Sequence, residues 1–448
     1  MNRQFLSDRP IPTGWQSLTV DEIKASEKHS CVAGPFGSSI SSKYFVAEGI
    51  PVIRGSNLRD DLTPFVPYGF VFVSPEQAKR YKGQHVKAGD LVFTCWGTLG
   101  QVGLIPQSGP FKEYIISNKQ LKLRPNPDLA DSRFLFYYFG SPQMVHHIRS
   151  IAIGAAVPGI NLGLLKGLRV TLPPLPIQRR IVEILSTYDD LIENNNRRIK
   201  ILNEIAQIVY REWFVCFRFP GHEKVNLIDS ELGPVPEGFA AEPLESVCRK
   251  ITDGSHWSPK SVDEGLPMAS VKDMHDWGLN LSSCRKVSQD DFDTLIRNDC
   301  KPLVGDVLIA KDGSYLKHCF WMQKENDVVI LSSIAILRPN ERIASSYLSL
   351  HLLDPQIKSR MAGYVSGVAV PRIVLKDFRR FNILRPPTTV QLAFSKVVEP
   401  MLQLCWCLTE KNAVLRRTRD FLLPKLISDE IPVEAAEETA IEAEMTTA

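Results

Sequence analysis

An uninterrupted helical pattern of apolar positions runs from Ile177 to Phe214, a segment without Gly or Pro. Apolar or aromatic residues recur there in steps of four and three, with Asn195 as the one polar member, which is typical of a coiled-coil seam. A helix of about 40 residues is roughly 60 Å long, so this stripe needs a partner of similar length. The seam residues are Ile181, Leu185, Tyr188, Ile192, Asn195, Ile199, Leu202, Ala206, Val209 and Trp213.

A second seam of the same kind lies 213 positions further along the chain. Antiparallel pairing about the midpoints of the two segments sets Asn195 opposite Asn412 and Tyr188 opposite Arg419. We therefore predict a buried Asn–Asn layer that fixes the register at some cost in stability; the alternative is that both Asn side chains face solvent. Replacing Asn195 by Leu is expected to raise the melting temperature only if the layer is buried. The second seam comprises Phe394, Val398, Met401, Cys405, Leu408, Asn412, Leu415, Arg419, Leu422 and Leu426.

The rest of the chain is duplicated as well, with a period the size of a domain. "GAAVPGINLGLLKGLRVTLPPLPIQRRI" (154–181) aligns without a gap with "GVAVPRIVLKDFRRFNILRPPTTVQLAF" (367–394). "KAGDLVFTCWGTLG" (87–100) aligns with "LVGDVLIAKDGSYL" (303–316), "LRPN" occurs at 123–126 and 337–340, and "SRFLFYYFGSPQ" (132–143) matches "SSYLSLHLLDPQ" (345–356).

Each half has the same internal order. Short β-branched and aromatic runs broken by Gly and Pro predict strands and turns, among them "DLVFTCW" and "DVLIAKDG". "FLFYYFGS" and "YLSLHLLD" predict a helix, and a double proline then precedes the long helix. Pro400 and Pro424 are expected to bend or shorten the second long helix.

The predicted fold class is therefore α+β, with two similar mixed α/β domains separated by two long antiparallel coiled-coil helices. The predicted boundaries are 1–174 for the first domain, 175–217 for the central helix, 218–386 for the second domain, 387–428 for the C-terminal helix and 429–448 for an acidic tail that is expected to be disordered.

Composition and charge add few constraints. No apolar run is long enough to cross a bilayer, and "MNRQFLSDRP" lacks the apolar region of a secretory signal, so a cytoplasmic protein is expected. The nine cysteines form no C-x-x-C pair, which argues against a disulfide framework or a structural zinc site. The net charge is +3, but the tail holds seven acids and no Lys or Arg, so residues 1–428 carry +10. Such a balance permits nucleic-acid binding without requiring it.

The order of two variable domains and two long helices, each helix entered through a "PP…Q" motif, resembles the DNA-specificity (S) subunit of type I restriction–modification enzymes. "LPPLPIQRRIVEILSTYDDLIENNNRRIKILNEIAQIVYREWFV" is similar to the central spacer of that family. "GPFGSSI" (34–40) and "ITDGSHWSP" (251–259) resemble the starts of target recognition domains, and "FLLPKLISDEI" (421–431) resembles the end of the second spacer. The second entry, "RPPTTVQLAF", departs from the family by lacking charged residues after Gln391.

The resemblance implies a non-catalytic adaptor. Each recognition domain would read one half of a split, asymmetric DNA site, and the helices would set the gap and hold two methyltransferase (modification) subunits. Motor–nuclease (restriction) subunits would join this core. S-adenosylmethionine, ATP and Mg²⁺ would belong to the partners, with no cofactor in this chain.

Motifs for catalysis are missing from the sequence. It has neither a G-x-x-x-x-G-K-[ST] loop nor an Asn-Pro-Pro-aromatic motif of amino-methyltransferases, and no metal-ligand spacing surrounds His146-His147 or His256. We expect no catalytic and no metal site. An enzyme with an unrecognised motif and a scaffold that binds proteins through its two duplicated domains remain the alternatives.

Polar and aromatic residues in turn-rich stretches are the candidates for DNA contact, because Lys and Arg neutralise phosphates and Arg, Asn and Lys read base edges. The alternative for each is a solvated loop side chain. The candidates are Lys43, Tyr44, Arg54, Asn57, Arg59, Trp96, Thr98, Asn118 and Lys119 in the first half, and His256, Trp257, Lys260, Lys272, Lys311, Ser314, Tyr315 and Lys317 in the second.

Overall fold

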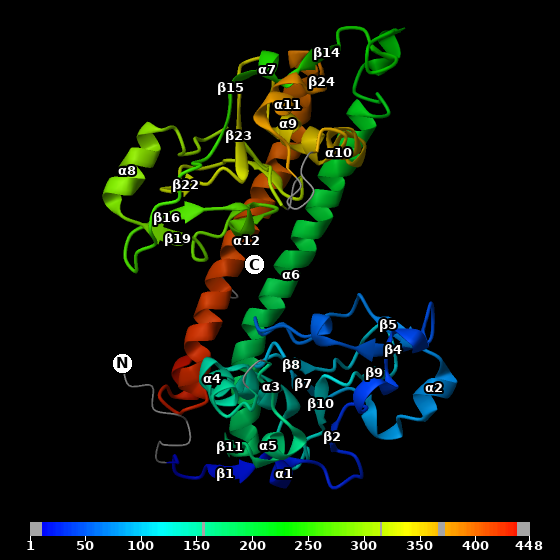
Figure 1. Ribbon diagram of the computed structural model, residues 1–448, viewed down its shortest axis with the longest axis vertical. Helices are drawn as coiled ribbons and strands as arrows, with labels where there is room; N and C mark the ends of the chain where they lie inside the picture. Colours follow the sequence, from blue (N-terminus) through cyan, green and yellow to red (C-terminus); the bar gives the residue numbers. More distant parts are fainter. Residues whose placement is uncertain (1–10, 155–156, 314–315, 366–371, 437–448) are drawn as a thin grey trace. The chain divides into compact units, whose positions relative to one another are not determined.

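The computed structural model describes residues 11–154, 157–313, 316–365 and 372–436 (Figure 1). It combines short strands and helices with two long helices, α6 (Leu175–Phe214, 40 residues) and α12 (Thr388–Leu426, 39 residues). The chain divides into two compact units, and the division falls inside both long helices. Unit 1 comprises Met1–Glu193 with Ala413–Ala448, and unit 2 comprises Asn194–Asn412. The predicted α+β class with two long helices is confirmed.

Unit 1 contains a four-stranded sheet of order β2-β10-β7-β8, a five-stranded sheet of order β3-β5-β4-β9-β6 and the pair β1–β11. The aromatic helix α3 packs against β8 and is almost wholly buried, as its apolar sequence requires. The strands are β1 (Gln16–Thr19), β2 (Cys31–Ala33), β3 (Phe45–Val46), β4 (Ile50–Ile53), β5 (Val71–Val73), β6 (His85–Val86), β7 (Leu91–Thr94), β8 (Val102–Leu104), β9 (Tyr114–Ile116), β10 (Gln120–Leu123) and β11 (Arg169–Leu172), and the helices are α1 (Val20–Ile23), α2 (Pro75–Lys79), α3 (Ser132–Gly140), α4 (Pro142–Ser150) and α5 (Leu162–Gly167).

Unit 2 repeats the four-stranded sheet as β15-β23-β20-β21 and adds a smaller sheet, β19-β16-β22, with the pairs β14–β24, β12–β13 and β17–β18. Its strands are β12 (Leu227–Ile228), β13 (Val235–Pro236), β14 (Ala240–Pro243), β15 (Cys248–Asp253), β16 (Leu266–Ala269), β17 (Met274–His275), β18 (Gly278–Leu279), β19 (Arg285–Val287), β20 (Val307–Ala310), β21 (Cys319–Trp321), β22 (Val329–Ile330), β23 (Ile334–Pro339) and β24 (Asn382–Arg385), and its helices are α7 (Leu244–Val247), α8 (Gln289–Arg297), α9 (Ser345–Leu353), α10 (Pro355–Ala362) and α11 (Leu375–Arg380).

The repeated "GD" and "LRPN" motifs form the same buried ion pair in both units. The Arg124 guanidinium donates to both oxygens of Asp90 (2.7 and 2.8 Å), and Arg338 does the same to Asp306 (2.8 and 2.9 Å). Each pair joins two neighbouring strands of the four-stranded sheet. The bidentate geometry is the strong form of the Arg–carboxylate contact, which explains why both motifs recur together.

The "PP…Q" motif ties the start of each long helix to its unit. Gln178 accepts a hydrogen bond from the Asp131 amide just before α3 (2.8 Å) and donates to the Pro173 carbonyl (2.8 Å). Gln391 makes the equivalent two contacts in unit 2, both at 2.8 Å. In both units the side-chain oxygen and nitrogen of the buried glutamine are hydrogen-bonded. These contacts fix the direction in which the long helix leaves the domain.

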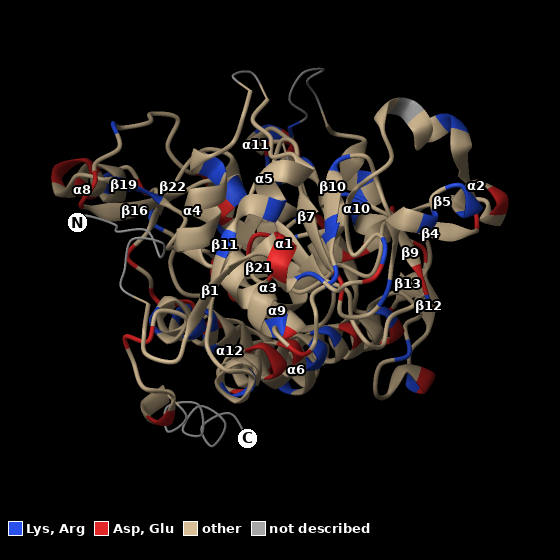
Figure 2. Cartoon of the chain, turned by 90° about the horizontal axis from the view of Figure 1, so that it is seen from below, with Lys and Arg blue, Asp and Glu red and all other residues tan. Residues whose placement is uncertain are grey.

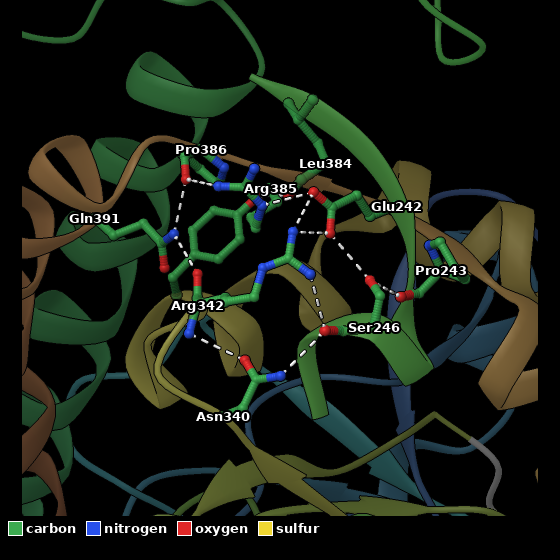
Figure 3. A network of polar contacts seen from close by, with 10 residues as sticks. Glu242, Pro243, Ser246, Asn340, Arg342, Leu384, Arg385, Pro386 and Gln391 are labelled. Atoms are coloured by element: carbon green, nitrogen blue, oxygen red, sulfur yellow. Dashed lines mark hydrogen bonds and ion pairs between the residues drawn. The ribbon is translucent and has the colours of Figure 1, made fainter. Parts of the chain in front are cut away.

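In unit 2 this junction is extended by an ionic network (Figure 3). Arg342 accepts a hydrogen bond from Gln391 through its carbonyl (3.0 Å), and its guanidinium pairs with Glu242 (2.6 Å). Arg385, on β24, also pairs with Glu242 (2.9 Å). Burial raises the pKa of that carboxyl, but hydrogen bonds from Arg385 and Ser246 and the positive charges of Arg385 and Arg342 outweigh it, so the pKa is lowered. The paired strands β14 and β24 and the helix entry of unit 2 thus share one set of polar contacts.

The long helices pair along the predicted seams within each unit, and every described seam residue is buried or half-buried. In unit 2 the Asn195 amide donates to the Asn412 side-chain oxygen (2.9 Å), with only 1% and 2% of the residues exposed. Asn412 in turn donates to Asn196 (2.9 Å). The solvent side of α6 carries both charge signs (Figure 2).

Arg419 does not take the predicted partner. In unit 1 its guanidinium pairs with Asp189 (2.6 Å), the residue after Tyr188, and with Asp420 (2.9 Å). A buried guanidinium needs a carboxylate, and the phenol of Tyr188 cannot supply one. Tyr137, from α3, donates to the other oxygen of Asp189, so the ion pair also joins α3 to the long helices.

The structure bears on two further expectations. Pro400 and Pro424 lie inside α12, which still spans 39 residues, so the expected shortening does not occur. The described part of the tail, 429–436, is ordered: Ala436 is buried and Glu434 pairs with Arg180 (2.8 Å). The rest of the tail lies outside the described residues.

Candidate nucleic-acid interface

The carboxyl ends of several strands of unit 1 meet at the segment 117–119. β4 and β9 run parallel, so both end at the same edge of their sheet. The Ser117 amide donates to the Ile53 carbonyl at this edge (3.0 Å). Loops that follow neighbouring parallel strands lie close together, which is a common way to build a binding surface.

The same segment meets the ends of two strands of the other sheet. The Gly34 amide, after β2, donates to the Gln120 carbonyl (2.9 Å), and the Cys95 amide, after β7, donates to the Lys119 carbonyl (2.8 Å). Four loops therefore converge, although they are far apart in the sequence. We call the segments 34–40, 54–59, 95–101 and 117–119 the strand-end loops of unit 1.

Two of the repeated sequence motifs also meet here. The Ile160 amide, at the end of "GAAVPGI", donates to the Cys95 carbonyl (2.9 Å), and Trp96 forms a bridge with Gly159. A Cβ on Gly159 would lie 2.3 Å from the Trp96 ring, so only glycine fits at this position. The glycine of the motif thus allows the indole to lie against the backbone.

Unit 2 has the same arrangement at its four corresponding strand ends. Three backbone hydrogen bonds of 2.8, 3.3 and 2.9 Å join the ends of β16, β15 and β20 to the segment 331–334, and the Ile373 amide donates to the Lys311 carbonyl (3.2 Å). The three bonds run from Leu331 to Ala269, from Gly254 to Ile334 and from Lys311 to Ser333. We call 254–260, 270–273, 311–313, 316–318 and 331–333 the strand-end loops of unit 2.

The residues predicted to contact DNA in the first half lie mostly on or beside these loops. Arg54 is half-buried and donates to the Gly69 carbonyl (3.3 Å), which fixes its guanidinium near the end of β4. Exposed are Lys43, Arg59, Trp96, Thr98, Asn118 and Lys119, and half-buried are Tyr44 and Arg54.

Asn57 is a structural residue, contrary to its predicted role. It is fully buried, its side-chain oxygen accepts from the Arg54 amide (3.0 Å), and its amide donates to the carbonyls of Val66 and Tyr68. Asp273 takes the equivalent place in unit 2 and accepts from the Ser270 amide (2.8 Å). Both residues close the turn that follows a strand, which is a usual role of Asn and Asp.

In the second half the structure brings together most of the candidates. Exposed are His256, Trp257, Lys260, Lys272 and Lys317, whereas Lys311 is buried, and Ser314 and Tyr315 lie outside the described residues. Lys311 pairs with Asp253 (3.1 Å) and Asp312 (3.5 Å), so its charge is neutralised within the protein. His256 approaches Asp253 as well (3.4 Å).

Phe36 is not among the residues predicted to contact DNA, but it is 96% exposed within the strand-end loops of unit 1. Its loop, "GPFGSSI", follows β2 as "GSHWSPK" follows β15, so Phe36 corresponds in place to the His256–Trp257 pair. Aligning these two loops on their first glycine would have identified it.

Two buried titratable groups lie on or next to the strand-end loops of unit 1. Burial raises the pKa of the Cys95 thiol to about 11, so it stays protonated. Burial also lowers the pKa of Lys122 to about 8; its ammonium donates to the Gly83 and His85 carbonyls beneath the loops. Across the described residues no group of His, Cys, Asp and Glu could hold a metal ion, and no described helix is long and apolar enough to cross a membrane.

Comparison with known proteins shows which proteins this chain is similar to. Residues 34–204 match the family model described as "Type I restriction modification DNA specificity domain". The chain is 23% identical over 436 residues to the type I restriction enzyme MjaIX specificity subunit of Methanocaldococcus jannaschii, covering 95% of each chain. It is 22% identical to the HindI specificity subunit of Haemophilus influenzae, covering 80% of this chain and 89% of that one.

The fold agrees with these matches. The chain superposes on the crystal structure of a type I restriction–modification S subunit from M. genitalium with a TM-score of 0.55 and 17% identity, covering 95% of this chain and 97% of that one. The chain is thus similar in sequence over nearly its full length, and in fold, to type I restriction–modification specificity subunits, and residues 34–204 match their DNA specificity domain.

Proposed function

We propose that this chain is the DNA-reading subunit of a type I restriction–modification complex, in which unit 1 and unit 2 each read one half of a bipartite site. The observation that carries the proposal is the recurrence of one loop cluster, hydrogen bond by hydrogen bond, in both units. Exposed cations and aromatic side chains gather on it in both places. Such a surface suits phosphates and base edges.

The two half-sites should differ, because the shared backbone carries different side chains. Lys119 of unit 1 corresponds to Ser333 of unit 2, and exposed Trp96 corresponds to half-buried Asp312. Bases are read by side chains whereas phosphate contacts set position, so unlike side chains on like loops give an asymmetric sequence.

The helices α6 and α12 would set the gap between the half-sites and bind two methyltransferase subunits, and motor–nuclease subunits would complete the assembly. S-adenosylmethionine for methylation, and ATP with Mg²⁺ for translocation and cleavage, would be bound by those partners. This chain would supply recognition and no catalytic site, and the complex would act on DNA in the cytoplasm. A scaffold that binds only proteins has no support from the relatives.

Salt dependence of binding tests the proposal. The complex of this chain with its modification subunits should bind one duplex from a randomised library, and the logarithm of its affinity should fall linearly with the logarithm of salt concentration. Lys119→Ala should reduce the slope by about 0.9, the value for one phosphate contact. Lys79→Ala is the matched control, because Lys79 is exposed on α2, which follows β5 at the opposite edge from the end of β4. Binding without salt dependence, or no selected duplex, would contradict the proposal.

A further inference from the structure

Each unit exposes an aromatic side chain at the same place, on the loop after the first strand of its four-stranded sheet. Phe36 is 96% exposed and Trp257 is 50% exposed. Exposing an aromatic ring of this size forgoes the stabilisation that its burial would give. Two such positions on corresponding loops point to a shared use.

The loop of unit 1 is held rigidly, so that the ring of Phe36 stays exposed. The Phe36 carbonyl accepts from the Ser39 hydroxyl (2.6 Å), and the next carbonyl, of Gly37, accepts from the Asn118 side chain (2.9 Å). The loop starts at Gly34, where a Cβ would lie only 1.8 Å from the Ser117 carbonyl oxygen. The loop therefore cannot fold back and bury the ring without losing these contacts.

The loop of unit 2 uses different residues for the same purpose. The Ser255 hydroxyl accepts from the Trp257 amide (3.1 Å) and donates to the Trp257 carbonyl (2.7 Å). A Cβ on Gly254 would lie 2.1 Å from the Ile330 carbonyl oxygen, as on Gly34 in unit 1. The rings of Phe36 and Trp257 are thus both held on a closed turn. Each turn begins at a glycine that packs directly against the backbone of a neighbouring segment.

The surroundings of both rings are cationic rather than apolar. Lys119 is exposed on the loop joined to that of Phe36, and Lys43 is exposed just after it. Exposed Lys260 lies on the same loop as Trp257. In unit 1, Trp96 is also 40% exposed on the strand-end loops. Isolated rings among ammonium groups do not fit an apolar protein surface, which would leave the charges unpaired. They fit duplex DNA, whose phosphates surround a stack of aromatic bases.

We propose that Phe36 and Trp257 are wedges that enter the duplex and stack against a base, one in each half-site. The inference rests on the proposed function and adds a mode of reading to it: local unstacking, which makes recognition depend on how easily a base step deforms. It also assigns a role to Phe36.

The test uses the complex of the full-length chain with its modification subunits and the duplex selected by it from a randomised library. 2-Aminopurine replaces single adenines in each half-site, because its fluorescence rises when it is unstacked. Binding of the wild type should raise the fluorescence at one position in each half. Phe36→Ala should abolish the rise in one half only and Trp257→Ala in the other only, each with about a tenfold loss of affinity, as expected for one base–aromatic contact.

Leu129→Ala and Val304→Ala are the matched controls. Both side chains are exposed, and both lie at the opposite ends of strands from the strand-end loops. The controls should leave affinity and fluorescence unchanged. Since Phe36 is almost fully exposed, Phe36→Ala should also melt like the wild type, which excludes unfolding as the cause of a loss.

The outcomes are distinguishable. If wild type selects no duplex, the proposed function fails. If wild type binds but shows no rise in fluorescence, or if Phe36→Ala and Trp257→Ala keep both the rise and the affinity within twofold, the wedge proposal is wrong and the proposed function stands. A loss of signal in both halves from either single variant would also contradict it, because each ring is assigned to one half-site.

Discussion

Asn195 and Asn412 form a buried side-chain hydrogen bond across the two long helices of unit 2. The bond changes what we expect from replacing Asn195 alone. Asn195→Leu leaves the Asn412 carbonyl oxygen buried without its donor, which costs about 1–3 kcal/mol. The single variant should therefore unfold at a lower temperature than the wild type.

The double variant Asn195→Leu/Asn412→Leu should melt at or above the wild-type temperature, because replacing both partners by apolar groups of similar size removes the unsatisfied oxygen. Calorimetry of the three proteins measures this. A double variant less stable than both single variants would mean that the layer contributes net stability rather than register alone.

Arg419 and Asp189 give a prediction with a defined pH dependence. Burial raises the pKa of the Asp189 carboxyl, and Arg419 opposes that rise. Arg419→Met removes the opposing charge, so this pKa should rise further above that of the unfolded chain. At neutral pH the variant should lose about 3–5 kcal/mol, the usual cost of breaking a buried pair.

The cost should shrink as the pH falls through the raised pKa, since the folded variant then binds a proton without penalty. Urea unfolding at about pH 5 and about pH 8 compares the two conditions. Arg417→Met, exposed on the same helix, should have a small effect at both. A cost for Arg419→Met that grows toward acid pH would contradict the assignment.

Gln178 and Gln391 should be equally sensitive to replacement, because both join a double proline and a domain helix through the same contacts. Gln178→Ala and Gln391→Ala should each cost about 1–3 kcal/mol from unsatisfied buried backbone groups. Denaturant unfolding measures both. Gln207→Ala, on the exposed side of α6, is the control, and equal effects of all three variants would show that the junction has no special role.

Gly34 and Gly254 are required by close backbone contact rather than by their own backbone angles. Gly34→Ala and Gly254→Ala should each cost about 1–3 kcal/mol, as for overpacking at a rigid site, and should weaken DNA binding in one half-site. Gly167→Ala serves as the comparison, because a Cβ there meets no atom within 4 Å. If Gly34→Ala is as stable as Gly167→Ala, the loop moves easily and is not a fixed platform.

The long-range periodicity of the helices could be read from the sequence because the seam follows a single geometric rule. Positions such as Asn195 and Asn412 follow from counting alone. The partner of Arg419 could not be predicted in this way. Its guanidinium pairs with Asp189, one residue beyond the position that the register sets opposite it. The sequence also did not predict that the tail is ordered up to Ala436, because an acidic segment with few apolar residues has no apolar periodicity.

The interface was only partly predictable for a similar reason. Residue type identified exposed cations such as Lys119, but it could not separate them from Lys311, whose charge is paired inside the protein. Nor could it distinguish Asn57, which closes a buried turn, from exposed Asn118. The convergence of the loops depends on β4 and β9 being parallel neighbours, a pairing that periodicity within one strand does not encode.

The most direct measurement is a base-resolution profile of modified adenines in host DNA, with this chain present and with its gene deleted. We expect paired modifications in one split motif with two unlike halves separated by a fixed gap, all lost on deletion. Substitutions in the strand-end loops of unit 1 should alter one half of that motif and leave the other intact. A continuous or palindromic motif, or a profile unchanged by deletion, would contradict the claim that two repeated units each read half of one site.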